Sequence, residues 1–157
     1  MKEFDNNGLR LAEFQGKIFE ESRDYFKCSS PIFLRRFYHS NLLFSLDKND
    51  SFLISFDIRE ALDSIERQFG SSKYGKEKYD KNALFWVGYM YRYISYTREV
   101  KTRFIMKTFP YKQMFDVYDA YHSQDSEWCV RSLLELNGLN EGYFDPNYRF
   151  KRAFMKV

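Results

Sequence analysis

The sequence predicts an all-α fold, a single-domain helical bundle of about six to seven helices around a central helix near residues 83–97. Apolar side chains recur at helical spacing through most of the chain, and no stretch alternates convincingly with the period of two that is typical of strands. Aromatic residues make up 20% of the 157 residues, against 7 Gly and 3 Pro, which favours a packed protein over a disordered one. This length suits one domain, residues 1–157.

The first helix is predicted over about Leu9–Lys27, where apolar residues recur at spacings of three, four and seven. Ser29 and Ser30 offer an N-cap to the next helix, and Pro31 fits its first turn, where the missing N–H costs nothing. This second helix is expected to continue through residues 31–46.

Capping residues mark the next two helices. Asp57 and Glu60 have the spacing of a capping box at the start of one helix, and Gly70 ends it. Asp80 or Asn82 can cap the helix that follows.

The remaining helices are shorter. A basic helix stops ahead of Pro110, since the residue before a proline is driven out of the helical region. Helices over Tyr111–Tyr121 and Ser126–Asn137 follow, and Gly138 closes the second of them. Residues 51–56 are expected to be extended rather than helical.

Charge is distributed unevenly along the chain. The net charge is only +3, but six basic residues and one acid lie within residues 92–112, while seven acids and one Arg lie within 113–145. A basic tail is expected at 146–157. No apolar run is long enough for a signal peptide or a membrane span, so the protein is expected to be cytoplasmic and to have no membrane partner.

The most unusual segment is FWVGYMYRYISYTRE, residues 85–99. Both of its faces are apolar or aromatic when it is drawn as a helix, which is typical of a helix packed on all sides. Trp86, Met90 and Ile94 are therefore predicted to be among the most buried side chains. Arg92 lies inside the same segment, where its burial must be compensated.

Two interpretations of Arg92 stay open. In one, Arg92 is a core residue whose guanidinium bonds an acid or a tyrosine hydroxyl of the protein itself. In the other, Tyr89, Arg92 and Tyr96 form the floor of a partner-binding groove, because an Arg held by aromatic rings is well placed to bind an anionic group.

RRFYH, residues 35–39, predicts an alternative catalytic site. A helix would place His39 beside Arg35 or Arg36, and an RNase toxin could use His39 as general acid or base and an Arg to stabilise phosphate charge. The spacing is shorter than the Arg-to-His spacing of helical HEPN-type nucleases. No catalytic residue is therefore assigned in the leading interpretation.

Basic residues interleaved with aromatic ones favour nucleic-acid binding as a second alternative. The residues that would carry it are Lys101, Arg103, Lys107, Arg149, Lys151 and Arg152. A solvated basic face, paired with the acidic segment within the fold or across a homo-oligomer, is the plainer explanation.

No metal or cofactor is expected. Cys28 and Cys129 are far apart and lack CxxC spacing, which favours two reduced, buried thiols. His39 and His122 provide no close pair of ligands to nucleate a zinc site.

Three segments resemble a group of small bacterial proteins: FLRRFYHS at 33–40, SKYGKEKYDKNALFWVGYMYRYISYTRE at 72–99 and YHSQDSEWCVRSLLE at 121–135. That group has an IFIRRF-like helix, a W-(I/V)-G-Y-(I/M)-Y-R-Y core and a Y-H-(S/T)-x-D segment. The resemblance implies a toxin–antitoxin-like gene cluster, sometimes beside an ADP-ribosyltransferase-like protein. The leading prediction is a non-enzymatic interaction protein, the antitoxin or accessory component, which binds a protein partner.

Overall fold

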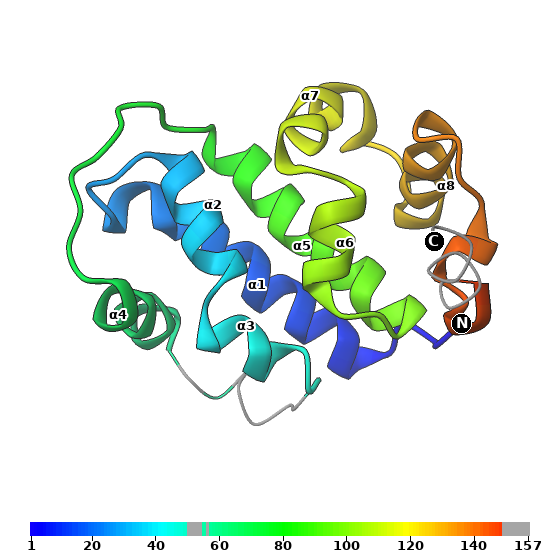
Figure 1. Ribbon diagram of the computed structural model, residues 1–157, viewed down its shortest axis with the longest axis horizontal. Coiled ribbons are helices and arrows are strands. Elements are labelled where there is room, and N and C mark those ends of the chain that lie inside the picture. The colour runs from blue at the N-terminus through cyan, green and yellow to red at the C-terminus, as the bar shows by residue number, and fades with distance from the viewer. Residues whose placement is uncertain (50–54, 56, 149–157) are drawn as a thin grey trace, which may run out of the picture. The chain divides into compact units, whose positions relative to one another are not determined.

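The computed structural model describes residues 1–49, 55 and 57–148 (Figure 1). All regular secondary structure in these residues is helical, which confirms the all-α prediction. The chain divides into two compact units, Met1–Tyr118 and Asp119–Val157. The elements in chain order are α1 Asn6–Tyr25, α2 Ser30–Tyr38, α3 Asn41–Leu46, α4 Ile58–Phe69, α5 Lys81–Arg98, α6 Thr102–Thr108, α7 Tyr111–Tyr121, α8 Ser126–Leu136 and the 3-10 helix η2 Glu141–Phe144.

The N-terminal helix begins earlier than its apolar pattern indicates. Asp5 caps α1 by accepting a hydrogen bond from the backbone N–H of Gly8 at 2.9 Å, so the helix starts at Asn6 rather than at Leu9. The first turn is polar, and periodicity alone could not find it.

The helix predicted over residues 31–46 is in fact two helices, α2 and α3. The chain leaves the helical conformation at Ser40, whose side chain accepts a hydrogen bond from the N–H of Leu43 at 3.0 Å. Gln68 of α4 also accepts a hydrogen bond from the N–H of Asn41, at 2.9 Å. A serine side chain that caps a new helix stabilises a chain break over continuation of the preceding helix. At Ser40 the capped break is the conformation that forms.

Most caps were predicted correctly. The side chain of Ser29 caps α2, and Asp57 and Asp80 cap α4 and α5; Asp125 caps α8 in the same way. Gly70 ends α4 with a positive φ of 79°. These caps depend on residues within one turn of the helix end, so the sequence states them directly.

Helices α1 and α5 lie side by side and run antiparallel through the first unit (Figure 1). Gly8 of α1 meets the ring of Tyr96 near the end of α5, and Gly16 meets Phe85 near its start. At Gly88 an added Cβ would lie 2.8 Å from the backbone oxygen of Gln15 and 2.7 Å from the ring of Phe19. The two backbones approach this closely because glycine lies at the contact.

The segment between α4 and α5, residues 70–80, is bonded to the rest of the first unit along its length. The backbone N–H groups of Ser29 and Ser30 donate to the carbonyl oxygens of Tyr74 and Glu77 at 3.0 and 2.8 Å. Lys78 donates to two carbonyl oxygens at the end of α1. The stretch that reads as a short linker therefore closes the N-terminus of α2 and the C-terminus of α1.

Burial along α5 agrees with most of the prediction. Every residue from Met90 to Arg98 is buried, with Met90 at 1% exposure and Ile94 at 0%. Trp86 is only half-buried, so its place among the most buried residues was wrong. Its ring packs edge-on against Tyr118 of α7.

In the second unit, α8 has four buried residues, Cys129, Val130, Leu133 and Leu134. The ring of Tyr121 packs edge-on against Trp128 with 5.1 Å between centroids. Across the described ranges, no helix is both long and apolar enough to cross a membrane.

Candidate functional site

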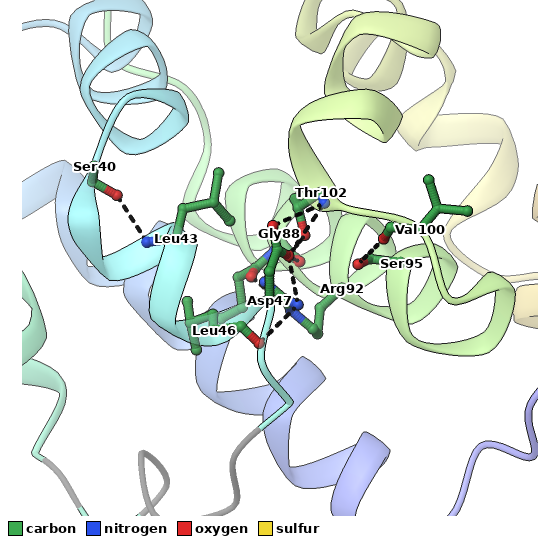
Figure 2. A network of polar contacts seen from close by, with 10 residues as sticks. Ser40, Leu43, Leu46, Asp47, Gly88, Arg92, Ser95, Val100 and Thr102 are labelled. Carbon is green, nitrogen blue, oxygen red and sulfur yellow. Dashed lines mark hydrogen bonds and ion pairs between the residues drawn. The ribbon is translucent and has the colours of Figure 1, made fainter. Parts of the chain in front are cut away.

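Arg92 lies at the centre of a buried polar network (Figure 2). Its Nε donates to Oε1 of Gln15 at 3.0 Å, and its Nη1 donates to the carbonyl oxygen of Leu46 and to Oδ1 of Asp47, each at 3.1 Å. Burial lowers the pKa of the guanidinium, and the negative charge of Asp47 acts against that shift. Arg92 is thus a core residue whose guanidinium bonds an acid of the protein itself, as the first interpretation predicted, although its Nη2 has no hydrogen-bond partner among the described residues.

Asp47 also accepts hydrogen bonds from the first residue of α6. Its carboxylate accepts hydrogen bonds from the backbone N–H of Thr102 at 3.2 Å and from the Thr102 hydroxyl at 2.6 Å. The N-cap position of α6 is Lys101, whose side chain makes no capping hydrogen bond. Asp47 therefore caps α6 from a distant part of the chain, and Figure 2 shows it between Arg92 and Thr102.

Gln15 completes the network from α1. Its Nε2 donates to the carbonyl oxygen of Gly88 at 2.9 Å while its Oε1 accepts from Arg92, so both ends of the amide are used. A buried glutamine satisfied in this way links α1 to α5 in one register.

The three residues predicted to form a partner-binding floor do not lie open to solvent together. Arg92 has no exposed surface, and Tyr96 is 1% exposed with its hydroxyl donating to Asp5 at 2.6 Å. Tyr89 is half-buried, and Phe4 packs edge-on against Tyr89 and Tyr96. In this structure the protein's own N-terminal segment covers the surface that a partner would need.

The predicted catalytic residues of RRFYH point to different neighbours. Arg36 donates to the carbonyl oxygen of Gly70 at 2.6 Å and lies over the ring of Phe69. Arg35 is exposed and lines a pocket between α2 and the start of α7 to which His39 does not contribute. His39 is exposed, with its ring edge-on to its neighbour Tyr38. Arg35 and His39 therefore do not line this pocket together.

A side chain of α6 reaches the C-terminal end of α2, and this brings together two basic segments that are far apart in sequence. Nε of Arg103 donates to the carbonyl oxygen of Tyr38 at 2.7 Å, and its guanidinium lies 5.9 Å from the centre of the Tyr38 ring. Lys107 follows Arg103 by one helical turn and is exposed, as Arg35 is. We call these four residues, Arg35, Tyr38, Arg103 and Lys107, the α2–α6 face.

The α2–α6 face is positive because its surrounding sequence lacks acids. Residues 25–46 and residues 100–115 contain no Asp or Glu. Lys101 is exposed at the start of α6 and adds to the same charge. The other predicted nucleic-acid residues, Arg149, Lys151 and Arg152, lie outside the described residues, as does most of the predicted basic tail.

Both thiols are buried and unbonded to each other. Burial raises the pKa of Cys28, and it raises the pKa of Cys129 to about 11. Within the described part of the chain, no three His, Cys, Asp or Glu side chains are grouped so that they could hold a metal ion.

No family model, curated protein or solved structure matches this chain. What it binds must therefore be inferred from its own side chains and from the resemblance of the three segments described above.

Proposed function

We propose that this chain is a non-enzymatic interaction protein of the bacterial cytoplasm, the antitoxin or accessory component of a toxin–antitoxin-like module that binds a protein partner. The observation that carries the proposal is the α2–α6 face, where the half-buried Arg103 of α6 contacts Tyr38 of α2, and Arg35 and Lys107 are exposed on the same two helices. Arg and Tyr are enriched among residues that dominate binding energy at protein interfaces. The resemblance of three segments to proteins of such modules supports the same function.

The partner is expected to present an acidic surface. The four residues of the α2–α6 face lie within two stretches that contain no Asp or Glu, so the face attracts negative charge and repels positive charge. Arg103 is already held against Tyr38 by a hydrogen bond, which lowers the entropy lost when a partner binds. A neighbouring-gene toxin, such as an ADP-ribosyltransferase-like protein, is the proposed partner.

Co-expression with the product of each adjacent gene tests the proposal. The wild-type protein should co-elute with one neighbour in size-exclusion chromatography. The double variant R35E/K107E should lose this complex, while the charge-matched double variant K73E/K76E, in the exposed part of the 70–80 segment, should keep it. Absence of co-elution with any neighbouring product contradicts the proposed function, and equal loss in both double variants contradicts the assignment to the α2–α6 face.

Nucleic-acid binding is a second candidate, and the same face favours it. Lys101, Arg103 and Lys107 lie on or beside one short helix, and Arg103 lies over the Tyr38 ring, so basic and aromatic groups are interleaved there. Fluorescence anisotropy with labelled single-stranded RNA and DNA at 50 and 200 mM salt separates this candidate from protein binding. Affinity that falls steeply with salt supports it, since neutralised phosphates release counterions. No salt-sensitive binding at micromolar protein excludes it.

We further propose that α5 is the central helix of the bundle. The complete burial of Met90–Arg98 supports this arrangement, because a helix buried on all sides needs neighbours on all sides. Native-state hydrogen exchange should find the slowest amides of the protein in this stretch. Faster exchange there than in α1 would assign the centre to α1 instead.

A further inference from the structure

A small pocket opens on the α2–α6 face, between α2 and the turn from α6 to α7. Its volume is about 270 Å³. The apolar part of its lining is formed by Pro31, Ile32, Leu34, Met106 and Pro110, and the polar part by Arg35, Tyr38 and Tyr111.

The sequence builds this pocket from two helical stripes. Pro31, Leu34, Arg35 and Tyr38 follow spacings of three, four and seven, so they share one side of α2. Met106 lies on α6, and Pro110 ends that helix and turns the chain into α7. The corner so formed leaves space beside α2.

The polar side chains at the rim differ in whether they already have partners within the protein. Arg35 makes no hydrogen bond or ion pair with the described residues, whereas the neighbouring Arg103 is bonded to the Tyr38 carbonyl. Tyr38 contributes a ring held between Arg103 and His39. At the far side of the pocket, Tyr111 packs against Tyr79. Burial raises the pKa of Tyr79 to about 12, and the negative charges of Glu77 and Asp116 add to that shift. One unpaired guanidinium thus faces an apolar floor.

We propose that this pocket binds a small carboxylate with an apolar body, such as a free aromatic or branched aliphatic acid. The planar fork of Arg35 matches a carboxylate in geometry and charge, and the phenol hydroxyls of Tyr38 and Tyr111 can donate to the same anion. The floor of Leu34 and Met106 excludes water from the apolar body. A volume just below the usual range of about 300 to 1,000 Å³ for ligand pockets selects a small molecule.

Carboxylate is favoured over phosphate because a single cation lines the pocket. Two negative charges would require a second cation, and Arg103 is directed to the Tyr38 carbonyl instead. The inference does not rest on the proposed protein partner, because the pocket is complete within the first unit of this chain.

Methionine-methyl NMR tests the inference. The chain has 5 Met, and Met106 lines the pocket while Met90 and Met114 are buried elsewhere and serve as internal references. Titration of the full chain with phenylacetate should shift the Met106 methyl resonance saturably. Phenylacetamide, which has the same shape without the charge, should bind at least about tenfold more weakly, as expected for loss of a charge-assisted hydrogen bond.

The variants R35Q and R35K decide whether Arg35 is the anion-binding group. R35Q should remove the preference for phenylacetate over phenylacetamide, R35K should keep part of it, and the control K73Q should keep all of it. Arg35 is exposed and makes no bond to described residues, so R35Q should melt at the wild-type temperature. The inference is overturned by an unmoved Met106 resonance, by equal shifts with acid and amide, or by an unchanged preference in R35Q. A shift with N-acetylglycylphenylalanine but not with phenylacetate also overturns it, since the pocket would then bind a chain terminus.

Discussion

Nη1 of Arg92 lies 3.1 Å from Oδ1 of Asp47, and the two side chains are 0% and 12% exposed. The same carboxylate accepts the first N–H and the hydroxyl of Thr102 at the start of α6. One acid therefore neutralises a buried cation of α5 and caps α6 while it ends α3. Three helices depend on this contact for their relative placement.

Replacing Arg92 by Ala should sharply lower the stability of the protein. The change leaves Asp47 without its cation and opens space in the core, and breaking one side of a buried ion pair costs about 3 to 5 kcal/mol. Urea unfolding followed by circular dichroism measures the loss. The exposed pair Lys17–Glu20 provides a control, because K17A should cost no more than about 0.5 kcal/mol. A loss in R92A as small as in K17A contradicts the core role of Arg92.

Asp47→Ala should be more damaging than Thr102→Val, which loses the hydroxyl bond to Asp47 but keeps the bond from the backbone N–H. Loss of the cap alone costs about 0.5 to 2 kcal/mol, whereas D47A also leaves Arg92 buried and unpaired. In a double-mutant cycle, R92M and D47A should couple, so that the double variant loses less than the sum of the two single losses. Additive losses would show that the two residues do not stabilise each other.

The sequence predicts the helices better than it predicts the contacts between them. Caps such as Asp57 and Asp80 act within one turn and can be found from spacing alone. The cap of α6 could not, because Asp47 lies 55 positions before Thr102. A signal was present in retrospect: α6 begins after Lys101, which cannot accept a hydrogen bond through its side chain. Such a start requires an acceptor from elsewhere.

Gly88→Ala should destabilise the protein even though alanine favours helices. The new Cβ would approach the backbone oxygen of Gln15 to 2.8 Å, and a backbone atom cannot swing away as a side chain can. Overpacking of this kind costs about 1 to 3 kcal/mol, against a gain of about 1 kcal/mol from helix propensity. Thermal melting should show a lower Tm for G88A and an unchanged one for E13A, a change on the exposed side of α1. A raised Tm for G88A would mean that α1 and α5 are further apart.

Alkaline pH should unfold the protein through three tyrosines with raised pKa values, the half-buried Tyr25 and Tyr79 and the buried Tyr91. Burial, with Asp63 adding to it, raises the pKa of Tyr25 to about 12, and burial also raises that of Tyr79 to about 12. Burial raises the pKa of Tyr91 well above its ordinary value. The folded state thus keeps protons that the unfolded state releases near pH 10, so this stability is complete below pH 10 and is lost as pH rises toward 12.

Urea midpoints measured from pH 8 to 11.5 check this dependence. The midpoint should stay level to about pH 9.5 and then fall. Y25F should weaken the fall, because its ring cannot ionise, whereas Y74F should not, since Tyr74 is largely exposed. If all 13 tyrosines ionise together near pH 10 in the folded protein, as read by absorbance at 295 nm, the predicted burial is contradicted.

The convergence of α2 and α6 lay beyond what the sequence could predict. RRFYH and the basic residues near Lys107 were each recognisable as charged clusters, but they are about 70 positions apart. Only the fold shows that Arg103 reaches the Tyr38 carbonyl. The sequence also left Arg92 open as a candidate for binding, because an arginine among tyrosines looks the same whether its partner is internal or external.

Both cysteines should resist thiol reagents while the protein is folded. Cys28 and Cys129 are 1% and 0% exposed, and the thiol of Cys129 donates to the carbonyl oxygen of Tyr121 at 3.2 Å. Burial raises the pKa of Cys129 to about 11, so almost none of it is thiolate at pH 8, and only the thiolate reacts quickly.

With Ellman's reagent at pH 8, the native protein should react far more slowly than the unfolded protein in guanidinium, which should release two equivalents. The variant S71C, at an exposed position, should react with one equivalent at once and so show that the reagent is competent. Rapid reaction of a native cysteine would mean that the segment carrying it opens readily, and the amide-exchange rates around Cys28 and Cys129 would then identify which unit opens.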